Sequence, residues 1–422
     1  MKKNRQHFWG KTALCALCSA MVLALPVSAA SIPAEGDLNQ DGYVNTTDVV
    51  LLRRHIAGGY DVEADEYASD LNADGYVNTS DVVLLRRYVA GGYDAELRPV
   101  SGYYTQKTVC EMPSLTAYPR FSEMAQASLA VPGLQQGLVP QGIDAWEERD
   151  AVLISAYSSN ANEPSVLLAV QVSTGRLIGE YRLKNTDGSN YTGHAGGVAV
   201  TSKNVFISEG GCLYRIPLTA LEKSGEVTIA EEIAVPVRAS FCNASGGILW
   251  VGDFYYGTSY PTDDFRHMVN RDGKTYYAWA VGYELEDTDR EICADAMVTG
   301  AFATPDCILS IADRIQGMVY VKDAGKIVLS QSYGRKNDST LYVYHDPMQE
   351  TPHTQVVLNG VSVPVWYVDS GELEEKITTL PMSEGVAYMK NRLYVLYESG
   401  AEKYRGDGKL PTDRVWTVDL TK

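Results

Sequence analysis

The stretch that decides the fold of the first part of the chain is a loop that occurs twice. Residues 37–48 read DLNQDGYVNTTD, and residues 70–81 read DLNADGYVNTSD. Nearly the same segment follows each copy: VVLLRRHIAGGYD after the first and VVLLRRYVAGGYD after the second. Two near-identical copies indicate one structural unit, a loop followed by a helix, that the chain uses twice.

The oxygen-bearing residues of each loop have the spacing of a calcium-binding loop. A calcium ion takes about six to eight oxygen ligands, and such a loop supplies them from positions 1, 3, 5, 7, 9 and 12, with Gly at position 6 for the bend. The predicted ligands are Asp37, Asn39, Asp41, Tyr43, Asn45 and Asp48 in the first loop and Asp70, Asn72, Asp74, Tyr76, Asn78 and Asp81 in the second. Position 12 is Asp where an ordinary EF-hand has Glu, so closure around the ion must be tighter or completed by water. The sequence therefore predicts two Ca²⁺ ions; the alternative is a pair of Asx-rich turns without metal.

Residues 35–98 resemble a type I dockerin, a small domain with paired loops that carry Asp at position 12 and are each followed by one helix. The resemblance implies calcium-dependent docking onto a cohesin module of a cellulosome scaffold, in two poses related by a half turn. It also implies that loop positions 10 and 11 and the early helix contact the cohesin. The corresponding residues are Thr46, Thr47, Arg53 and Arg54 in one copy and Thr79, Ser80, Arg86 and Arg87 in the other. The alternative for the arginines is a solvated helix end, where cations suit the helix dipole.

The start of the chain has the features of a secretory signal peptide. Lys2, Lys3, Arg5 and Lys11 are basic, residues 12–25 are apolar, and residues 27–30 offer a small-residue cleavage site. We therefore expect residues 1–30 to be removed and the protein to be extracellular. The net charge of −17 argues against nucleic acid or a membrane surface as a partner. The cysteines outside the leader, an odd and scattered set, are expected to be mostly reduced and buried.

From residue 101 to 422 the sequence changes to short β-type runs separated by Gly, Asp and Asn. A polar residue and Gly open the predicted inner strands at 141–146, 195–200, 316–321 and 384–388, with a weaker copy at 239–241. Predicted middle strands follow at 152–157, 205–209, 248–253, 327–331 and 393–398, and third strands at 166–172, 213–217, 276–285, 341–344 and 414–420. Five such copies predict an all-β domain, most simply a five-bladed β-propeller. The sequence as a whole therefore predicts a small α-helical calcium-binding domain followed by this all-β domain.

Some features of this second domain stay open from the sequence. Residues 105–115 are expected to supply the strand that closes the ring, and residues 121–129 to form a short amphipathic helix. A sixth blade within the long insertions is an alternative, and so is a β-sandwich or jelly roll, because turn spacing suits both architectures.

In a propeller, residues just before inner strands and at the ends of middle strands line the central funnel. Asp253 and Glu384 each interrupt an apolar strand environment, where desolvation raises a carboxyl pKa, so they are the predicted acid/base pair. The predicted substrate-binding residues are His194, Gln316, Gln331, Tyr333, Arg335 and Glu398. Paired carboxylates suit cleavage of glycosidic bonds. The alternative is that these groups only satisfy backbone polar atoms around a water-filled axis.

The dockerin resemblance implies a secreted cellulosome subunit that degrades plant cell-wall polysaccharide, by hydrolysis of O-glycosyl bonds or by lysis. One alternative is a non-catalytic propeller that binds carbohydrate or protein. Another is an esterase-like or phosphatase-like hydrolase. The sequence contains no zinc-binding His-Glu-x-x-His, no Gly-x-Ser-x-Gly elbow and no phosphate-binding loop.

Overall fold

A computed structural model of the chain describes residues 36–39, 44–58, 69–72, 76–91, 104–285 and 301–422. The chain divides into two compact units, Met1–Leu97 and Arg98–Lys422, and each is described here by itself. The predicted leader, residues 1–30, lies outside the described residues, as do the predicted ligands Asp41, Tyr43 and Asp74. Among the described residues, no helix combines the length and hydropathy needed to cross a membrane.

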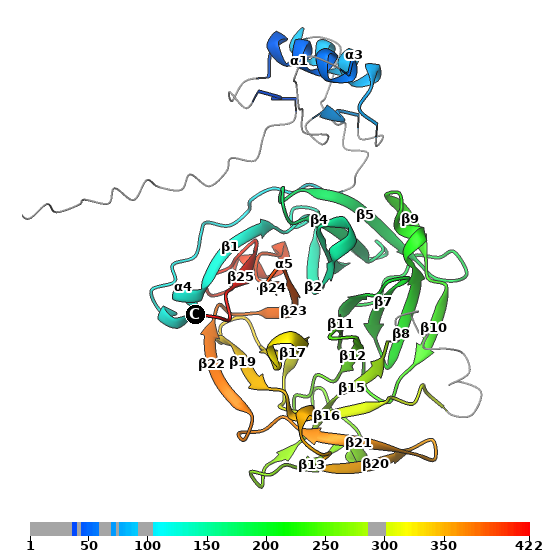
Figure 1. Ribbon diagram of the computed structural model, residues 1–422, viewed down its shortest axis with the longest axis vertical. Helices are drawn as coiled ribbons and strands as arrows, with labels where there is room; N and C mark the ends of the chain where they lie inside the picture. Colours follow the sequence, from blue (N-terminus) through cyan, green and yellow to red (C-terminus); the bar gives the residue numbers. More distant parts are fainter. Residues whose placement is uncertain (1–35, 40–43, 59–68, 73–75, 92–103, 286–300) are drawn as a thin grey trace, which may run out of the picture. The chain divides into compact units, whose positions relative to one another are not determined.

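The first unit contains two matching helices, α1 (Thr46–Ile56) and α3 (Thr79–Val89) (Figure 1). Asn45 and Asn78 cap their N-termini, and the next acidic residue of each copy returns a side-chain bond to the cap, so both helices begin with a capping box. One face of each helix is buried, through Val49 and Leu52 in α1 and Val82 and Leu85 in α3, and packs with Leu71. A core this small leaves room for bound metal to contribute to stability.

The second unit is a ring of five sheets around a central axis, which confirms the predicted five-bladed propeller (Figure 1). Blade 1 contains β2 (Leu138–Trp146), β3 (Ala151–Ser158), β4 (Val166–Gln171) and β5 (Leu177–Lys184). Blade 2 contains β6 (Gly197–Val200), β7 (Asn204–Glu209), β8 (Cys212–Pro217) and β10 (Glu231–Ala234). Blade 3 contains β11 (Phe241–Ser245), β12 (Ile248–Gly252), β15 (Ala278–Glu284) and β16 (Cys307–Ile311). Blade 4 contains β17 (Ile315–Val321), β18 (Lys326–Gln331), β19 (Ser339–His345) and β22 (Leu373–Thr379).

Blade 5 closes the ring by combining the two ends of the domain. Its strands are β23 (Ser383–Met389), β24 (Arg392–Tyr397), β25 (Arg414–Val418) and, from the start of the domain, β1 (Ala125–Ala130). The expectation that residues 105–115 form the closing strand was therefore wrong. The expected helix at 121–129 was also only partly right, because α4 (Pro119–Met124) ends where β1 begins. The alanines of β1 favour a helix, but the open edge of β25 needs a partner, and that pairing prevails.

Two blades receive strands from the next blade along the chain. β9 (Gly225–Thr228), which leaves blade 2, pairs in parallel with β5 of blade 1. β21 (Val361–Tyr367), which leaves blade 4, pairs in parallel with β16 of blade 3 and carries β20 (Thr354–Leu358) beyond it. A short hairpin, β13 (Met268–Val269) and β14 (Thr275–Tyr276), extends from blade 3. These crossings cover the outer edges of blades 1 and 3 and connect neighbouring blades.

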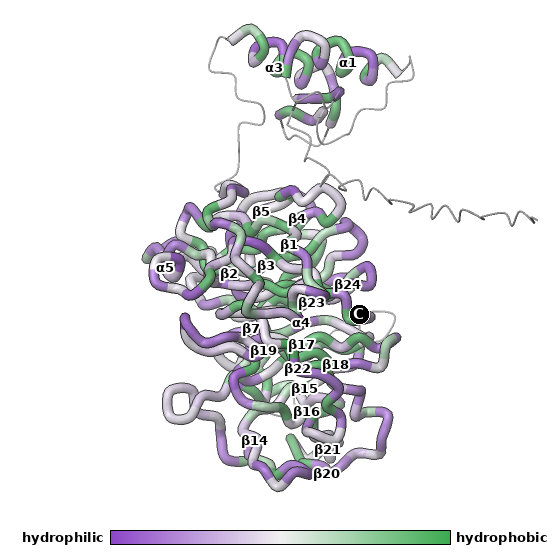
Figure 2. Tube along the Cα trace, turned by 90° about the vertical axis from the view of Figure 1, so that its left-hand side faces the viewer, coloured by the Kyte–Doolittle hydropathy of each residue, from purple (hydrophilic) through white to green (hydrophobic). Residues whose placement is uncertain are grey.

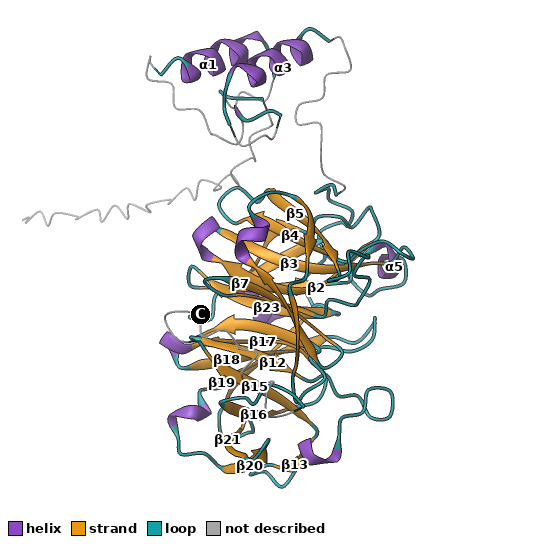
Figure 3. Ribbon diagram, turned by 90° about the vertical axis from the view of Figure 1, so that its right-hand side faces the viewer, coloured by secondary structure: helices purple, strands orange, loops and turns teal. Residues whose placement is uncertain are grey.

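The strands form the core and the connections form the surface. Figure 3 shows that strands make up nearly all of the regular structure of the propeller, and Figure 2 shows hydrophobic residues concentrated on the strands. The four described cysteines outside the leader are free thiols, and Cys242 and Cys307 are buried.

At the axis, glycine lets neighbouring inner strands approach each other. A Cβ on Gly142 would lie 2.5 Å from the backbone N of Val198 in blade 2, and one on Gly385 would lie 2.8 Å from that of Ile143 in blade 1. Gly197 and Gly317 face adjacent backbone in the same way. Ring closure therefore requires the glycine of the pattern that marked the inner strands.

A buried carboxyl that the sequence did not single out joins three blades near the axis. Asp144 of β2, 2% exposed, accepts hydrogen bonds from Val200 N of β6 (2.8 Å), Ala244 N of β11 (3.0 Å) and Asn243 Nδ2 (2.8 Å). Burial raises the pKa of Asp144 to about 7, and these hydrogen bonds act in the opposite direction. With both oxygens engaged by the protein, Asp144 serves the assembly of the ring.

Candidate functional site

A pair of glutamates occupies the end of the axis at which the inner strands begin. Glu384 stands near the start of β23 and Glu398 directly follows β24, and the pairing of Ser383 with Tyr397 places the two side by side. Their carboxyl groups are hydrogen-bonded to each other. Gln316 Nε2 of blade 4 donates to Glu384 Oε1 at 3.1 Å, and Gln141 Nε2 of blade 1 donates to Glu398 Oε2 at 3.1 Å. The axial cluster (Gln141, Gln316, Glu384 and Glu398) thus draws on three blades.

Burial gives this pair unusual protonation. It raises the pKa of Glu384 well above its ordinary value, and the adjacent charge of Glu398 raises it further. Burial also raises the pKa of Glu398 to about 7, although the Gln141 hydrogen bond and the charges of Lys403 and Arg335 oppose the change. Near neutral pH the pair therefore holds a shared proton, with Glu384 as the donor and Glu398 as the acceptor.

Aromatic rings and a lysine lie beside the carboxyl pair. The rings of Tyr157 and His194 are stacked with centroids 4.3 Å apart. The Tyr157 hydroxyl lies 3.1 Å from that of Tyr404 and accepts a hydrogen bond from Lys403 Nζ at 2.8 Å. Lys403 and Tyr404 come from the short helix α5 (Glu402–Arg405). Rings with polar tips beside hydrogen-bonding groups suit the faces and hydroxyls of a sugar.

His194 and Glu209 bring blade 2 to the same region. Surrounding protein atoms lower the pKa of His194, while the negative charge of Glu209 acts to raise it. The Glu209 carboxylate accepts hydrogen bonds from the Tyr191 hydroxyl and, at 3.5 Å, from Ala195 N. His194 is thus an exposed imidazole that lies beside the Glu209 carboxyl group.

The two predicted residues of the loop after β18 point to different neighbours. The Arg335 guanidinium stacks 4.8 Å from the ring centroid of Tyr404 and pairs with Asp407 at 2.6 Å. Tyr333 instead contacts the ring of Tyr256 at 5.4 Å and lies under Arg314 at 4.4 Å. Arg335 therefore belongs to the axial region, whereas Tyr333 faces blade 3.

Asp253 is placed apart from the pair. Its carboxylate is 0% exposed and accepts hydrogen bonds from Arg238 N (2.7 Å) and Trp279 N (3.2 Å), with Arg266 Nε 3.6 Å away. Burial raises its pKa and Arg266 opposes the change. Glu384 is similarly buried, at 3% exposed, but it has a second carboxyl beside it, whereas Asp253 is engaged by Arg266 and by backbone N–H groups. The geometry gives Glu384 a different partner, Glu398, which the sequence had placed among the substrate-binding residues.

Gln331 also lies outside the axial region. Its side chain donates to Asp313 O at 2.7 Å and accepts from the Tyr342 hydroxyl at 3.1 Å, and it lines a separate cavity between blades 3 and 4. A larger cavity of about 820 Å³ lies at the opposite end of the axis, among the turns that follow the inner strands. None of the predicted catalytic or substrate-binding residues lines this larger cavity.

In the first unit, the position-12 aspartates close their loops in the same way. Asp48 Oδ1 accepts from Leu38 N (2.9 Å) and Asn39 N (3.4 Å), and Oδ2 accepts from Asn45 N (2.8 Å). Asp81 repeats this set with Leu71 N, Asn72 N and Asn78 N. Both carboxylates are fully buried.

The donor set of these loops fits calcium. A carboxylate has about four acceptor positions, so three backbone contacts leave capacity for a cation. The remaining described donors are carboxylate, amide and carbonyl oxygens, which a hard cation prefers. The described residues alone do not form a cluster of three acidic, His or Cys side chains. The backbone contacts show how the short Asp reaches the loop that an ordinary EF-hand closes with Glu.

The residues predicted to contact a partner are all on the surface. Those of α1 are Thr46, Thr47, Arg53 and Arg54, those of α3 are Thr79, Ser80, Arg86 and Arg87, and every one is exposed. Val50, 51% exposed, lies among the first four, and Val83, 55% exposed, among the second four. Each helix thus presents an equivalent face, with an uncovered valine between hydroxyls and guanidinium groups.

Comparison with known proteins identifies the first unit. Residues 35–90 match the family model of the dockerin type I domain. No curated protein matches the chain. Similar solved structures include glutaminyl cyclase of Myxococcus xanthus, at 10% identity over 70% of this chain and 95% of that one, with a TM-score of 0.36. A putative oxidoreductase (glucose dehydrogenase) of Thermus thermophilus is similar at 11% identity over 70% of this chain and 99% of that one, with a TM-score of 0.33.

The propeller assignment rests on the strand topology and not on these likenesses. Type I dockerin domains bind calcium, and their presence implies cohesin binding and association with a cellulosome. The chain therefore combines a type I dockerin domain with a five-bladed β-propeller.

Proposed function

We propose that this protein is a secreted cellulosome subunit whose propeller cleaves a plant cell-wall polysaccharide at the axial cluster. The observation that carries the proposal is the Glu384–Glu398 pair, which holds a proton near neutral pH beside sugar-compatible rings. Attachment to a scaffold through the dockerin would bring this site to the polymer. Removal of residues 1–30 on export belongs to the same proposal.

The pair would act as one acid. A neutral carboxyl can protonate the leaving oxygen of a glycosidic bond, which requires a pKa near the working pH. Glu384 would donate this proton, and Glu398 would hold the remaining charge. Lys403 and Arg335 stabilise that charge.

The base would come from another group, because hydrogen-bonded carboxyls are closer than the separation of about 5 Å or more that glycosidases use between their two carboxylates. Glu209 is another carboxylate of this region and lies beside His194. Hydrolysis would use Glu209 to activate water. Lysis would instead use Glu209 to remove the proton on the carbon next to a uronate carboxylate, while Glu384 protonates the glycosidic oxygen as it leaves.

The same contacts favour a second candidate, a non-catalytic carbohydrate-binding propeller. Gln141 and Gln316 hold the two carboxyls in hydrogen bonds that connect blades 1, 4 and 5. In that case the shared proton would serve the assembly of the ring, and the rings of Tyr157 and His194 would bind sugar without cleavage.

For the dockerin, we propose that two calcium ions bind, one to each loop, and that either exposed helix face contacts a cohesin. The near-identity of the faces on α1 and α3 supports two poses related by a half turn.

The test compares cleavage and binding in the full chain loaded with calcium. Glu384→Gln removes the proposed acid, Glu398→Gln removes its partner, and Glu402→Gln, on exposed α5, makes the same substitution outside the carboxyl pair as a control. We expect the first variant to lose about 100-fold or more in the release of new sugar ends and to keep its affinity for the polymer. Unchanged cleavage by Glu384→Gln would contradict the catalytic role. Binding without cleavage in every form, the unaltered chain included, would favour the second candidate.

A further inference from the structure

The cavity between blades 3 and 4 has about 400 Å³ of space, which is the size of a small-ligand site. The loop that leads into β17 contributes Asp313 and Arg314 to its lining. Tyr342 of β19, Lys376 of β22 and Lys274, next to β14, also line the cavity. None of the four residues of the axial cluster lines this cavity.

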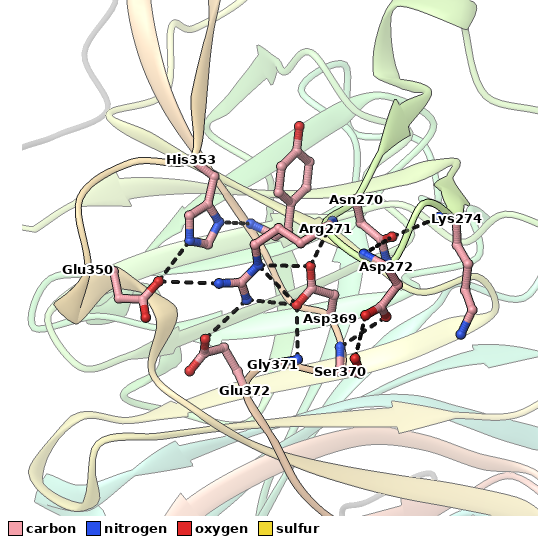
Figure 4. Close-up of polar contacts among 11 residues, drawn as sticks. Asn270, Arg271, Asp272, Lys274, Glu350, His353, Asp369, Ser370, Gly371 and Glu372 are labelled. Carbon is pink, nitrogen blue, oxygen red and sulfur yellow. Dashed lines mark hydrogen bonds and ion pairs between the residues drawn. The ribbon is translucent and has the colours of Figure 1, made fainter.

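Two pairs of contacts hold in place the wall of the cavity that Asp272, Asp369 and Ser370 form. Arg271 donates to Asp369 through Nη2 at 2.7 Å and through Nε at 3.0 Å, and Asp272 accepts from Ser370 (Figure 4). These contacts join the β13–β14 hairpin of blade 3 to the segment that returns to blade 4. Because the wall is held by the protein itself, a ligand would not have to order it on binding.

The acidic groups of this wall are engaged by other groups of the wall. Besides Asp369, Arg271 contacts Glu372 at 3.1 Å and Glu350 at 3.3 Å, and Glu350 also binds His353 at 3.0 Å (Figure 4). Together with the Asp272–Ser370 contact, this network gives each of these carboxylates a partner within the wall.

The cations that line the cavity, two exposed lysines and the half-buried Arg314, have no such partners. Across the described ranges, Lys274, Lys376 and Arg314 make no ion pair. The Lys376 ammonium instead lies 5.5 Å from the ring centroid of Tyr342, and Arg314 stacks on Tyr333. The cavity is also lined by Asp272 and Asp369, which are engaged by Ser370 and Arg271, and by Asp313. Three cations without an ion-pair partner around one cavity favour a negatively charged ligand.

The other groups indicate a ligand with a ring and hydroxyls. The rings of Tyr342 and Tyr344 are stacked, with centroids 6.0 Å apart, and offer an apolar surface. The Oδ1 atom of Asp313 is buried and has no hydrogen-bond partner. A buried acceptor without a donor is unfavourable, and a ligand hydroxyl would satisfy it. Burial also raises the pKa of Asp313, and the charge of Arg314 opposes the change.

We propose that this cavity binds a uronic-acid unit of a polysaccharide, with the sugar ring against Tyr342, the carboxylate toward Lys274 and Lys376, and a hydroxyl toward Asp313. The site is distinct from the axial cluster and does not require that cluster to be catalytic.

The test uses two matched probes, a trimer of galacturonic acid and its methyl ester, which differ only in the charge of the carboxyl groups. Calorimetric titration of the full chain with calcium should show that the acid binds about tenfold or more tightly than the ester, and that this preference declines with added salt. Lys274→Met with Lys376→Met should abolish the preference. Lys107→Met with Lys223→Met, which removes the same charge at exposed positions outside the cavity, should preserve it.

Equal binding of acid and ester would overturn the proposal, and so would a preference that persists in the Lys274/Lys376 variant. Titrations are repeated with the Glu384→Gln chain, so that cleavage of a probe does not affect the result. Failure here would leave the proposed catalytic role untouched, because that role is read from cleavage and not from this preference.

Discussion

The unusual protonation of Glu398 predicts a specific change in stability with pH. Its pKa is about 7 in the folded chain, against an ordinary value of 4.5, so the folded state holds the proton over a range in which the unfolded chain releases it. The contribution of Glu398 to the free energy of unfolding is therefore fully present below about pH 4.5 and is lost as the pH rises to about 7. Glu398→Gln removes this loss and preserves the hydrogen bond from Gln141.

The size of the effect follows from the shift. Each pKa unit corresponds to about 1.4 kcal/mol, so Glu398 should lower the free energy of unfolding by up to about 3 kcal/mol between pH 4.5 and pH 8. Asp144, whose pKa is also raised to about 7, contributes in the same direction, but it is present in both chains and cancels in the comparison. The free energy of unfolding of Glu398→Gln, taken relative to that of the unaltered chain, should therefore be higher at pH 8 than at pH 5, by up to about 3 kcal/mol.

Urea unfolding followed by tryptophan fluorescence measures this difference. Residues 35–90 contain no tryptophan and residues 101–422 contain five, so the signal reports the propeller. For a slope of about 3 kcal/mol per molar urea, the midpoint difference between the two chains should change by about 1 M between pH 5 and pH 8. Glu402→Gln, an exposed control, should follow the unaltered chain. Parallel pH curves for Glu398→Gln and the unaltered chain would refute the assignment of a shared proton to this pair.

Three further predictions concern the ring and the dockerin. Gly142→Ala should destabilise the propeller by about 1–3 kcal/mol or more, because its Cβ would meet backbone 2.5 Å away, whereas Gly406→Ala, with no atom within 4 Å, should change stability little in the same urea assay. Asp48→Ala should reduce the calcium stoichiometry measured by titration from two ions to one and destabilise the dockerin by about 2 kcal/mol; two ions bound with unchanged affinity would contradict the ligand assignment. Alanine at Thr46, Thr47, Arg53 and Arg54 together should weaken cohesin binding by less than about tenfold, and the added change of Thr79, Ser80, Arg86 and Arg87 should reduce it by more than about 100-fold. A full loss from the first set alone would show that only one face binds.

The parts of the fold that repeat could be predicted from the sequence. The dockerin loops were recognisable because twelve positions recur with their oxygen donors in place. The inner strands were recognisable because ring closure requires Gly at positions such as Gly142 and Gly385, each after a polar residue. The strands that do not repeat were missed. β1, β9 and β21 pair with strands distant in sequence, and no local pattern encodes an edge that another blade must cover.

The candidate site could be predicted only in part, for a related reason. Glu384 and Glu398 were both selected as polar residues next to strands, but their pairing follows from the register of β23 against β24. Asp253 has the same local signal, yet the long insertion that follows it supplies Arg266 and encloses the carboxylate. Lys403 and Tyr404 lie in the short helix α5 after β24 and carried no pattern of their own. Asp144 stands within a strand, and only the assembled ring shows that three blades meet at its carboxyl.

Product analysis tests the central claim, cleavage at the axial cluster, most directly. The full chain with calcium is incubated with a panel of plant cell-wall polysaccharides, and the products are examined by mass spectrometry. We predict new oligosaccharides, carrying one added water if the reaction is hydrolysis or an unsaturated end if it is lysis, and their absence with Glu384→Gln. Polysaccharides that all remain intact, or identical products from the Glu384→Gln chain, would contradict the account.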